Sequence, residues 1–175
     1  EHPDLEPPFL CLIVSGGHTH LVIVKDYGEF EILGRTRDDA AGECFDKCAR
    51  AMGFPYPGGV HIDKASVSGN KDAYELPRPK VTGSEFDFSF SGLKTAVINL
   101  LHNSQQKGIE INKNDLSAGI QYTISDILCE KTMAAAEMLG YKTIAVAGGV
   151  SANSGVRAAF EKACAERDMK LYLPP

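Results

Sequence analysis

The chain has 175 residues, of which 43% are hydrophobic and 23% charged, and its 18 basic and 23 acidic side chains give a formal net charge of -5. At roughly 150 residues per domain, this length predicts a single globular domain over residues 1–175, large enough to bury a core without disulfides. The acidic balance argues against a surface that coats nucleic acid broadly, and no apolar run approaches the ~20 residues that cross a bilayer.

The beginning of the chain predicts three consecutive strands. Two apolar runs flank the turn Ser15-Gly16-Gly17, and a third follows the turn Asp26-Tyr27-Gly28, as in an antiparallel meander. The expected strands cover residues 9–14, 20–24 and 29–33.

Two helices are expected after the meander. Apolar side chains recur at helical spacing from Ala41 to Met52, and Gly53 ends the pattern. A loop rich in proline and glycine separates this helix from a shorter one over residues 60–67. The candidate N-caps of the first helix are Thr36, Asp38 and Asp39.

The second half of the chain ends in a strand, a helix and a strand, which is the pattern of a parallel crossover. Together with the meander, this crossover predicts a layered α/β domain on a mixed sheet. In chain order, the expected elements are an extended segment over 76–82, a strand or extended segment over 86–90, a helix over 91–101, a polar loop over 103–114, a long helix capped by Asp115 and ended by Gly140, a strand over 143–147, a helix over 151–167 and a strand over 169–173.

The phenylalanines of residues 86–90 alternate with polar residues, and such a stripe is more often core than a surface for stacking bases. Each cysteine has apolar neighbours in sequence, and no two of them form a Cys-x-x-Cys pair. This pattern predicts free thiols in the core of a protein from a reducing compartment. Because the first residues are acidic and proline-rich, unlike a signal peptide, we expect a cytoplasmic protein. The five cysteines are Cys11, Cys44, Cys48, Cys129 and Cys164.

Three glycine pairs stand at turns. Gly16-Gly17 joins the first two strands, Gly58-Gly59 precedes the short helix, and Gly148-Gly149 joins a buried strand to a helix. Glycine lets backbone N–H groups approach an anion, and a helix N-terminus attracts phosphate. One such pair alone is most often only a turn. Three pairs in one domain predict a nucleotide site.

Four carboxylates lie close in sequence to these glycines. Asp39, Glu43 and Asp46 share one helix face, and Asp63 lies in the helix after Gly58-Gly59. A carboxylate at such a place can accept hydrogen bonds from ribose hydroxyls or from a substrate amine. For Asp39 and Glu43 we expect a solvated acidic face, whereas the spacing of Asp46 leaves a site and a solvated face equally open.

Two kinds of chemistry lack their motifs. The chain has no Gly-x4-Gly-Lys-Ser/Thr loop, and no carboxylate stands beside Gly16-Gly17 to hold a metal, so nucleotide binding is favoured over phosphoryl transfer. His18 and His20 share one face of a strand, but no third ligand stands near them in sequence, so a complete metal site is not expected.

Taken together, these motifs resemble, in order and over almost the whole chain, those of the bacterial tRNA adenosine threonylcarbamoyltransferase family, formerly called O-sialoglycoprotein endopeptidases or glycoproteases. The matching segments are Val14-Ser15-Gly16-Gly17-His18-Thr19, Asp38-Asp39-Ala40-Ala41-Gly42-Glu43, Phe45-Asp46-Lys47, Tyr56-Pro57-Gly58-Gly59, Phe88-Ser89-Phe90-Ser91-Gly92-Leu93-Lys94-Thr95 and Gly148-Gly149-Val150-Ser151-Ala152-Asn153.

The resemblance implies the ribonuclease-H-like fold of actin, sugar kinases and Hsp70, of which this chain holds mainly the second half. It implies transfer of a threonylcarbamoyl group from threonylcarbamoyl-AMP to the exocyclic amine of the adenosine 3′ of the anticodon, in tRNAs that read codons beginning with A. The ligand is then threonylcarbamoyl-AMP, or ATP or ADP. The implied substrate contacts are Ile13, Val14, Ser15, Gly16, Gly17, Asp46, Gly59, Asp63 and Asn153.

The family also holds an iron or zinc ion, whose ligands the resemblance places outside residues 1–175. His2, His18 and His20 do not replace those ligands, so we expect no transfer activity from this piece alone. The implied partners are tRNA and, in bacteria, a paralogous subunit and a P-loop ATPase subunit; no membrane is involved. Two alternatives stay open, a non-catalytic nucleotide-binding scaffold of the same fold and a metal-dependent glycoprotein endopeptidase.

Overall fold

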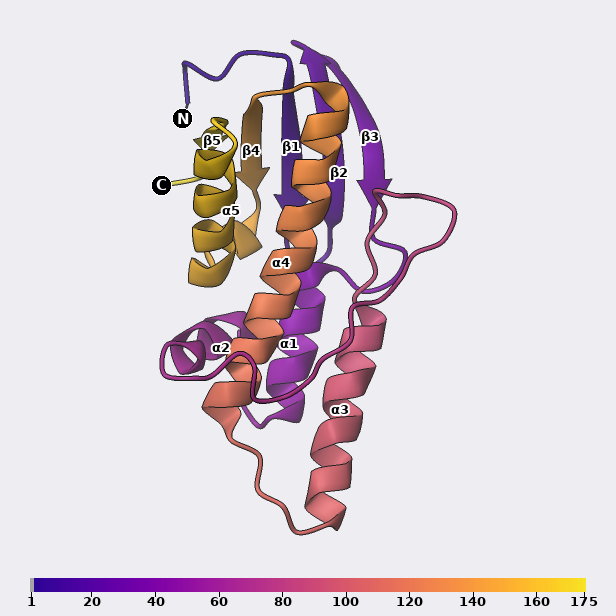
Figure 1. The fold of residues 1–175 in the computed structure, drawn as a ribbon, viewed down its shortest axis with the longest axis vertical. Helices are drawn as coiled ribbons and strands as arrows, with labels where there is room; N and C mark the ends of the chain where they lie inside the picture. The colour runs from indigo at the N-terminus through magenta and orange to yellow at the C-terminus, as the bar shows by residue number, and fades with distance from the viewer. Residues whose placement is uncertain (1) are drawn as a thin grey trace.

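A computed structural model describes residues 2–175, and its five strands form one mixed sheet (Figure 1). The strand order is β3-β2-β1-β4-β5, in which β1 pairs antiparallel with β2 and parallel with β4, and β4 pairs parallel with β5. The predicted meander, crossover and mixed α/β sheet are therefore confirmed. The strands are β1 Phe9–Val14, β2 Thr19–Asp26, β3 Glu29–Arg35, β4 Thr143–Ala147 and β5 Lys170–Tyr172.

The helices form two groups around this sheet. Figure 1 shows α5 and the second half of α4 over one face, while α1, α2 and α3 lie beyond the ends toward which β1 and β4 point. The first half of α4 packs against α2, so this helix ties the two groups together. The helices are α1 Ala41–Ala51, α2 Gly58–Ser66, α3 Ser91–Gln106, α4 Lys113–Leu139 and α5 Ser154–Glu166, with a 3-10 turn, η1, at Gly149–Ala152.

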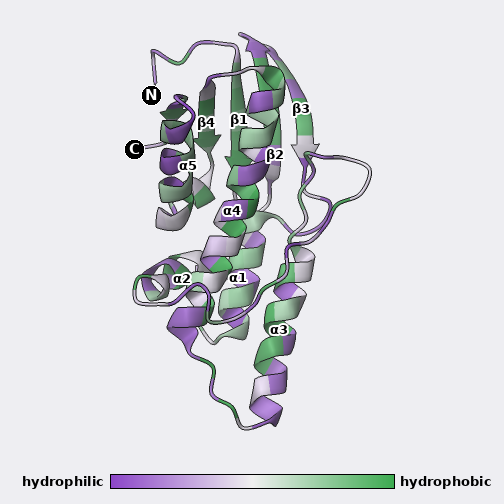
Figure 2. Ribbon diagram, viewed as in Figure 1, coloured by the Kyte–Doolittle hydropathy of each residue, from purple (hydrophilic) through white to green (hydrophobic). Residues whose placement is uncertain are grey.

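The core lies between the sheet and these helices, and hydrophobic residues dominate the central strands (Figure 2). In β1, Leu10, Leu12 and Val14 are fully buried, whereas Cys11 and Ile13 alternate with them on the opposite face and stay partly exposed. The phenylalanines at 86, 88 and 90 are at most 7% exposed, which confirms their core role.

The cysteines are free thiols, as the sequence predicts, and all but Cys11 are buried. Burial raises the pKa of the Cys11 thiol to about 11 and that of Cys129 to about 12. Both thiols therefore stay protonated at neutral pH.

Over residues 2–175, no helix combines the length and the apolar character that a bilayer crossing requires.

The N-caps predicted for α1 are wrong, because its first N–H groups find partners elsewhere in the fold. The Ala41 N–H donates to the Thr19 hydroxyl at 3.0 Å, and the Gly42 N–H donates to the Ser15 carbonyl at 3.1 Å. Helix α1 is thus anchored on the turn between β1 and β2. The residues wrongly predicted as its caps are Thr36, Asp38 and Asp39.

Asp38 caps a different helix, α3. Its carboxylate accepts the N–H groups of Phe90 at 2.8 Å and Ser91 at 3.0 Å, and the Ser89 hydroxyl as well. Partial burial raises the pKa of Asp38, but these hydrogen bonds outweigh it and hold the pKa below its ordinary value.

Replacing Asp38 should make the free energy of unfolding less dependent on pH in the acidic range. We expect Asp38→Ala to lower the free energy of unfolding at pH 7 by about 1 kcal/mol, the usual effect of losing a helix cap. A depressed folded-state pKa contributes stability above the unfolded pKa and loses it as pH falls through the folded value. Urea unfolding at several pH values should therefore show the gap between the wild type and Asp38→Ala shrinking below about pH 4. A gap that does not change with pH would contradict this role.

Several other helix ends differ from their predictions. Helix α2 begins at Gly58 rather than Val60, α3 continues to Gln106 rather than Leu101, and α5 begins after η1. The continuation of α3 shortens the predicted loop over residues 103–114 to a short connection.

The N-cap of α4 also moves upstream of the predicted Asp115. Asn112 accepts the Asp115 N–H at 3.1 Å, while the Asp115 carboxylate accepts the Asn70 N–H at 2.8 Å. Gly140 ends α4 in the left-handed conformation, as predicted.

Candidate functional site

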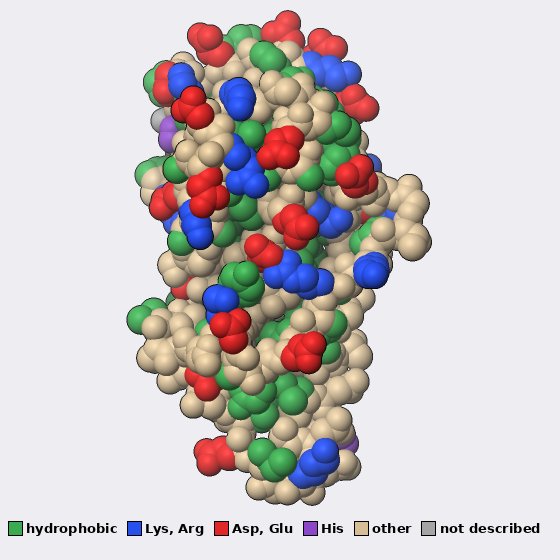
Figure 3. Space-filling model, viewed as in Figure 1, with side chains coloured by type: hydrophobic (Ala, Val, Ile, Leu, Met, Phe, Trp, Pro, Cys, Tyr) green, Lys and Arg blue, Asp and Glu red, His purple; other side chains and the backbone are tan. Residues whose placement is uncertain are grey.

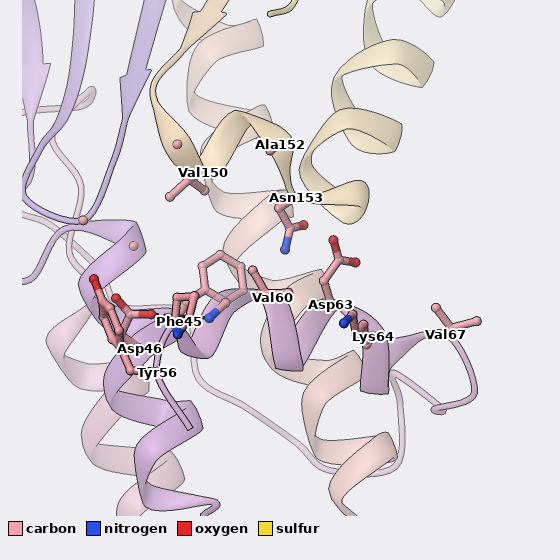
Figure 4. A pocket seen from close by; sticks show the side chains of 15 residues that line it. Phe45, Asp46, Tyr56, Val60, Asp63, Lys64, Val67, Val150, Ala152 and Asn153 are labelled. Atoms are coloured by element: carbon pink, nitrogen blue, oxygen red, sulfur yellow. Dashed lines mark hydrogen bonds between the residues drawn. The ribbon is translucent and has the colours of Figure 1, made fainter. Parts of the chain in front are cut away.

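A cavity of about 570 Å³ lies where the β1–β2 turn, α1, α2 and the β4–α5 connection meet (Figure 4). The parallel strands β1 and β4 both end beside it, and open α/β sheets bind ligands at such a carboxyl edge. The lining residues are Gly16, Gly42, Phe45, Asp46, Tyr56, Pro57, Gly59, Val60, Asp63, Lys64, Val67, Gly149, Val150, Ala152 and Asn153.

Five of the nine predicted contacts line this cavity, although they come from four separate segments of the chain. They are Gly16, Asp46, Gly59, Asp63 and Asn153. In Figure 4, Asp46 lies at one end of the cavity beside Phe45 and Tyr56, while Asp63 and Asn153 face each other further along.

The other four predicted contacts lie in the β1–β2 turn or just before it but do not line the cavity. Val14 is fully buried, and Ile13 lies on the opposite face of the sheet with His18 and His20. The Ser15 hydroxyl accepts the His18 N–H at 3.0 Å and so closes the turn. Gly17 is exposed within the same turn.

The glycines around the cavity fall into two groups. An added Cβ would meet the Ser15 carbonyl oxygen at 2.5 Å from Gly42, the Ala49 Cβ at 2.4 Å from Gly58 and the Val14 carbonyl oxygen at 2.1 Å from Gly148. Packing therefore requires glycine at these three positions. By contrast, an added Cβ would meet nothing within 4 Å at Gly16 or Gly149, both of which line the cavity.

Open space at Gly16 and Gly149 means that protein packing does not explain the missing side chains there. Both residues face the cavity, so their bare backbone leaves room for another molecule to approach closely. Within the pair Gly148-Gly149, the first glycine serves the fold and the second keeps the cavity open. Gly58 and Gly59 divide the same way, because the nearest atom to an added Cβ at Gly59 is 3.7 Å away.

Asp46 projects from α1 and caps α2. One of its carboxylate oxygens, Oδ1, accepts the N–H groups of Gly58 at 3.0 Å and Gly59 at 3.3 Å. Pro57, at the N-cap position of α2, supplies no side-chain acceptor of its own, so Asp46 supplies one from another helix. Asp46 is thus a half-buried cap of α2 in the cavity wall and not part of a fully exposed acidic face.

Asp63 and Asn153 hold the N-terminus of α5. Asn153 is its N-cap, and its Oδ1 accepts the N–H groups of Gly155 at 2.9 Å and Val156 at 3.1 Å. The Asp63 carboxylate accepts the Ser154 N–H at 2.8 Å and the Ser154 hydroxyl. This end of the cavity therefore combines a negative carboxylate with a helix N-terminus.

Asp39 is not the solvated carboxylate that its sequence position suggests. It forms ion pairs with Lys94 at 2.6 Å and Lys47 at 3.5 Å, and its side chain is only 13% exposed. Burial raises the pKa of Asp39, but the two lysines and neighbouring hydrogen bonds outweigh it and keep the pKa below its usual value. Glu43 lies 3.6 Å from Lys47 and remains at the surface, as expected.

The described residues do not fit a metal centre. His18 Nδ1 and His20 Nε2 lie 3.3 Å apart, but within residues 2–175 no three His, Cys, Asp or Glu side chains gather as a ligand set. Two histidines alone do not complete the coordination shell of an iron or zinc ion.

The sequence prediction missed the apolar wall of the cavity. Phe45, Tyr56, Val60 and Val150 line it, and flat or branched apolar side chains suit a planar ring. Phe45 belongs to the apolar stripe of α1 and is only 2% exposed, so its periodicity signals core and conceals its second role.

Gln121 of α4 was also missed. Its side chain lies between Asn153 and Asp63, which both line the cavity. Gln121 Oε1 accepts a hydrogen bond from the Asn153 amide, and Gln121 Nε2 donates one to the Asp63 carboxylate. A glutamine is unusual among the buried residues of a helix, and this was the one available signal.

The family model for tRNA N6-adenosine threonylcarbamoyltransferase matches residues 1–175. Proteins of that name are 51% identical in Clostridium botulinum (strain Hall) and 49% identical in Clostridioides difficile (strain 630), in each case over the whole chain and 52% of the relative. The relative in Bacillus licheniformis is 52% identical over 98% of the chain and 50% of its own length. The chain thus spans about half the length of the curated relatives it matches.

Solved structures share the fold at low sequence identity. Full-length HypF in a phosphate- and nucleotide-bound form has a TM-score of 0.70 and 12% identity, over 97% of this chain and 30% of that one. The activator of 2-hydroxyisocaproyl-CoA dehydratase from Clostridium difficile, with bound ADPNP, has a TM-score of 0.54 and 14% identity, over 97% and 55%. These likenesses confirm the actin-like α/β fold class that the resemblance implied. Since the family model covers every residue, the chain belongs to the tRNA N6-adenosine threonylcarbamoyltransferase family.

Proposed function

We propose that the cavity binds the adenylate part of threonylcarbamoyl-AMP, and that a full-length protein containing this chain transfers the threonylcarbamoyl group to tRNA. The observation that carries the proposal is the convergence of Gly16, Asp46, Gly59, Asp63 and Asn153 on one cavity at the carboxyl ends of parallel strands. The names of relatives whose sequences are 51% and 52% identical to this chain support the reaction. The nucleotides bound in two structures of the same fold support the ligand class.

The cavity offers complementary surfaces for the parts of an adenylate. Phe45, Val60 and Val150 give an apolar wall for the purine ring. The open backbone at Gly16 and Gly149 leaves room for a phosphate beside N–H groups. ATP and ADP share these parts and fit the same interpretation.

In the proposed reaction, the exocyclic amine of the tRNA adenosine attacks the carbamoyl carbonyl carbon. A carbon–nitrogen bond forms, the bond between that carbon and the phosphate oxygen breaks, and AMP leaves as the amine loses a proton. This chain's share is to hold the adenylate in place, which contributes to catalysis by positioning. No side chain of the chain needs to act as a covalent nucleophile.

Two alternatives are not favoured. Relatives that match the whole chain at about half identity are named as tRNA-modifying transferases. That name suits neither a non-catalytic nucleotide-binding scaffold nor a glycoprotein endopeptidase.

We further propose that tRNA binds through local contacts, together with the two partner subunits that the resemblance implies. On the face seen in Figure 3, basic and acidic side chains are interspersed and form no broad basic field. A nucleic acid therefore needs specific contacts or partner surfaces on this face. We also propose that the full-length protein holds the iron or zinc ion that the family resemblance implies.

A transfer assay with the full-length protein and its partner subunits tests this function. Threonylcarbamoyl-AMP with labelled threonine should label a tRNA that carries adenosine 3′ of the anticodon, but not the same tRNA with guanosine there. Asp46→Ala should reduce labelling at limiting substrate, whereas the exposed Glu161→Ala should not. Equal labelling of both tRNAs, or no labelling by a folded preparation of all subunits, would refute the proposed transfer.

A further inference from the structure

Gln121 is a polar side chain of α4 that is only 8% exposed. It lies against α2 and the N-terminus of α5, to which its amide is hydrogen-bonded. We infer that Gln121 is a positioning residue that orients Asp63 and Asn153 to bind the vicinal hydroxyls of a ribonucleoside. The inference rests on the proposed function, because it concerns the same cavity and its adenylate ligand.

The hydrogen bonds around Gln121 run in one direction. The backbone N–H groups of Gly155 and Val156 occupy Asn153 Oδ1, which turns the Asn153 Nδ2 group toward Gln121 Oε1 at 2.8 Å. With its oxygen engaged there, Gln121 presents Nε2 to Asp63 Oδ1 at 3.3 Å. The N-terminus of α5 thereby sets the orientation of two side-chain amides and one carboxylate.

Asp63 and Asn153, the two partners of Gln121, each keep one unused hydrogen-bonding position for a ligand. A carboxylate offers about four acceptor positions. Asp63 uses three of them, for the Gln121 amide and for the N–H and hydroxyl of Ser154. Among the described residues, the Asn153 amide donates one of its two hydrogens, to Gln121.

A vicinal diol matches these two remaining positions. One hydroxyl can donate to Asp63 while its neighbour accepts from Asn153, and both side chains line the cavity facing each other (Figure 4). A 2′,3′-dideoxy sugar offers neither contact. Gln121 thus supports discrimination for ribose without touching the ligand itself, because it is not among the cavity-lining residues.

The packing around Gln121 is fitted to its side chain. A Cβ added at Gly155 would lie 2.7 Å from Gln121 Cγ and 2.8 Å from Nε2, so an alanine there would displace the amide. Alanine is otherwise more favourable than glycine within a helix. Gly155→Ala should therefore move Gln121 while leaving α5 formed.

The test compares the binding of ADP and 2′,3′-dideoxy-ADP to the full-length protein by calorimetry. We expect the wild type to prefer ADP by about tenfold or more, as for a hydrogen bond to a charged group. Gln121→Ala and Gly155→Ala should reduce this preference severalfold, chiefly by weakening ADP. Gln121→Glu should reduce it too, because it keeps the size and the acceptor but removes the donor to Asp63.

The outcomes separate the two claims. An undiminished ADP preference in Gln121→Ala, with a folded variant, overturns the inference and leaves nucleotide binding intact. A Gln121→Glu variant that behaves like the wild type also overturns it, since Gln121 would then only fill space. A folded wild type that binds neither nucleotide overturns the proposed function and the inference together.

Discussion

Gly148→Ala is expected to destabilise the protein by about 2 to 6 kcal/mol, from backbone strain of about 1 to 3 and overpacking of about 1 to 3. Gly148 has φ +98° and ψ 166°, a region that only glycine adopts readily. Its missing Cβ would lie 2.1 Å from the Val14 carbonyl oxygen, in the main chain of the central strand β1. Neither obstacle can be relieved by rotating a side chain.

This loss is a large fraction of the stability of a typical domain. Urea unfolding, followed by far-UV circular dichroism, should show a much lower midpoint for Gly148→Ala than for the wild type. The matched control is Gly149→Ala, where an added Cβ meets nothing within 4 Å. Gly149→Ala should fold normally and instead weaken nucleotide binding, because it fills space in the cavity. Similar midpoints for the two variants would show that the packing argument is wrong.

Asp63→Ala is expected to weaken ADP binding about 10- to 150-fold, the equivalent of one hydrogen bond of about 1.5 to 3 kcal/mol to a charged group. The substitution removes the proposed acceptor for a ribose hydroxyl. It also removes the acceptor for the Ser154 N–H, the Ser154 hydroxyl and the Gln121 amide. The side chains at this end of the cavity therefore lose the hydrogen bonds that fix their positions. Calorimetric titration of ADP measures the change.

Two further variants make this result specific. Asp63→Asn keeps one oxygen acceptor and should weaken binding less than Asp63→Ala. Glu161→Ala removes an exposed carboxylate of α5 that does not line the cavity, and it should bind as the wild type does. If Glu161→Ala weakened binding as much as Asp63→Ala, a general disturbance of α5 rather than the cavity would be responsible, because losing a negative charge by itself favours an anionic ligand.

The local sequence predicted the elements of the fold well because periodicity and turn residues act over a few residues. Three helix starts depend instead on an aspartate from elsewhere in the chain. Asp38 caps α3, Asp46 of α1 caps α2, and Asp63 of α2 binds the first N–H of α5. Such caps bring residues 12 to 91 positions apart together, so no short sequence pattern contains both partners.

The candidate site shows the same limit. Asp46, Gly59, Asp63 and Asn153 were predicted on motifs and do line one cavity. Glycines required by packing and glycines that leave the cavity open look alike in sequence, and only their spatial neighbours separate Gly148 from Gly149. Gln121 escaped prediction because its role depends on α2 and α5, which are both distant in the chain.

Whether this cavity binds an adenylate is decided by calorimetric titration of ADP into the wild-type full-length protein. We expect saturable binding with one ADP per chain, and a non-reactive threonylcarbamoyl-adenylate analogue should abolish it by competition. A folded protein that takes up no ADP and no analogue would contradict this expectation, because Asp46, Asp63 and Asn153 would then serve only to cap and join the helices around the cavity.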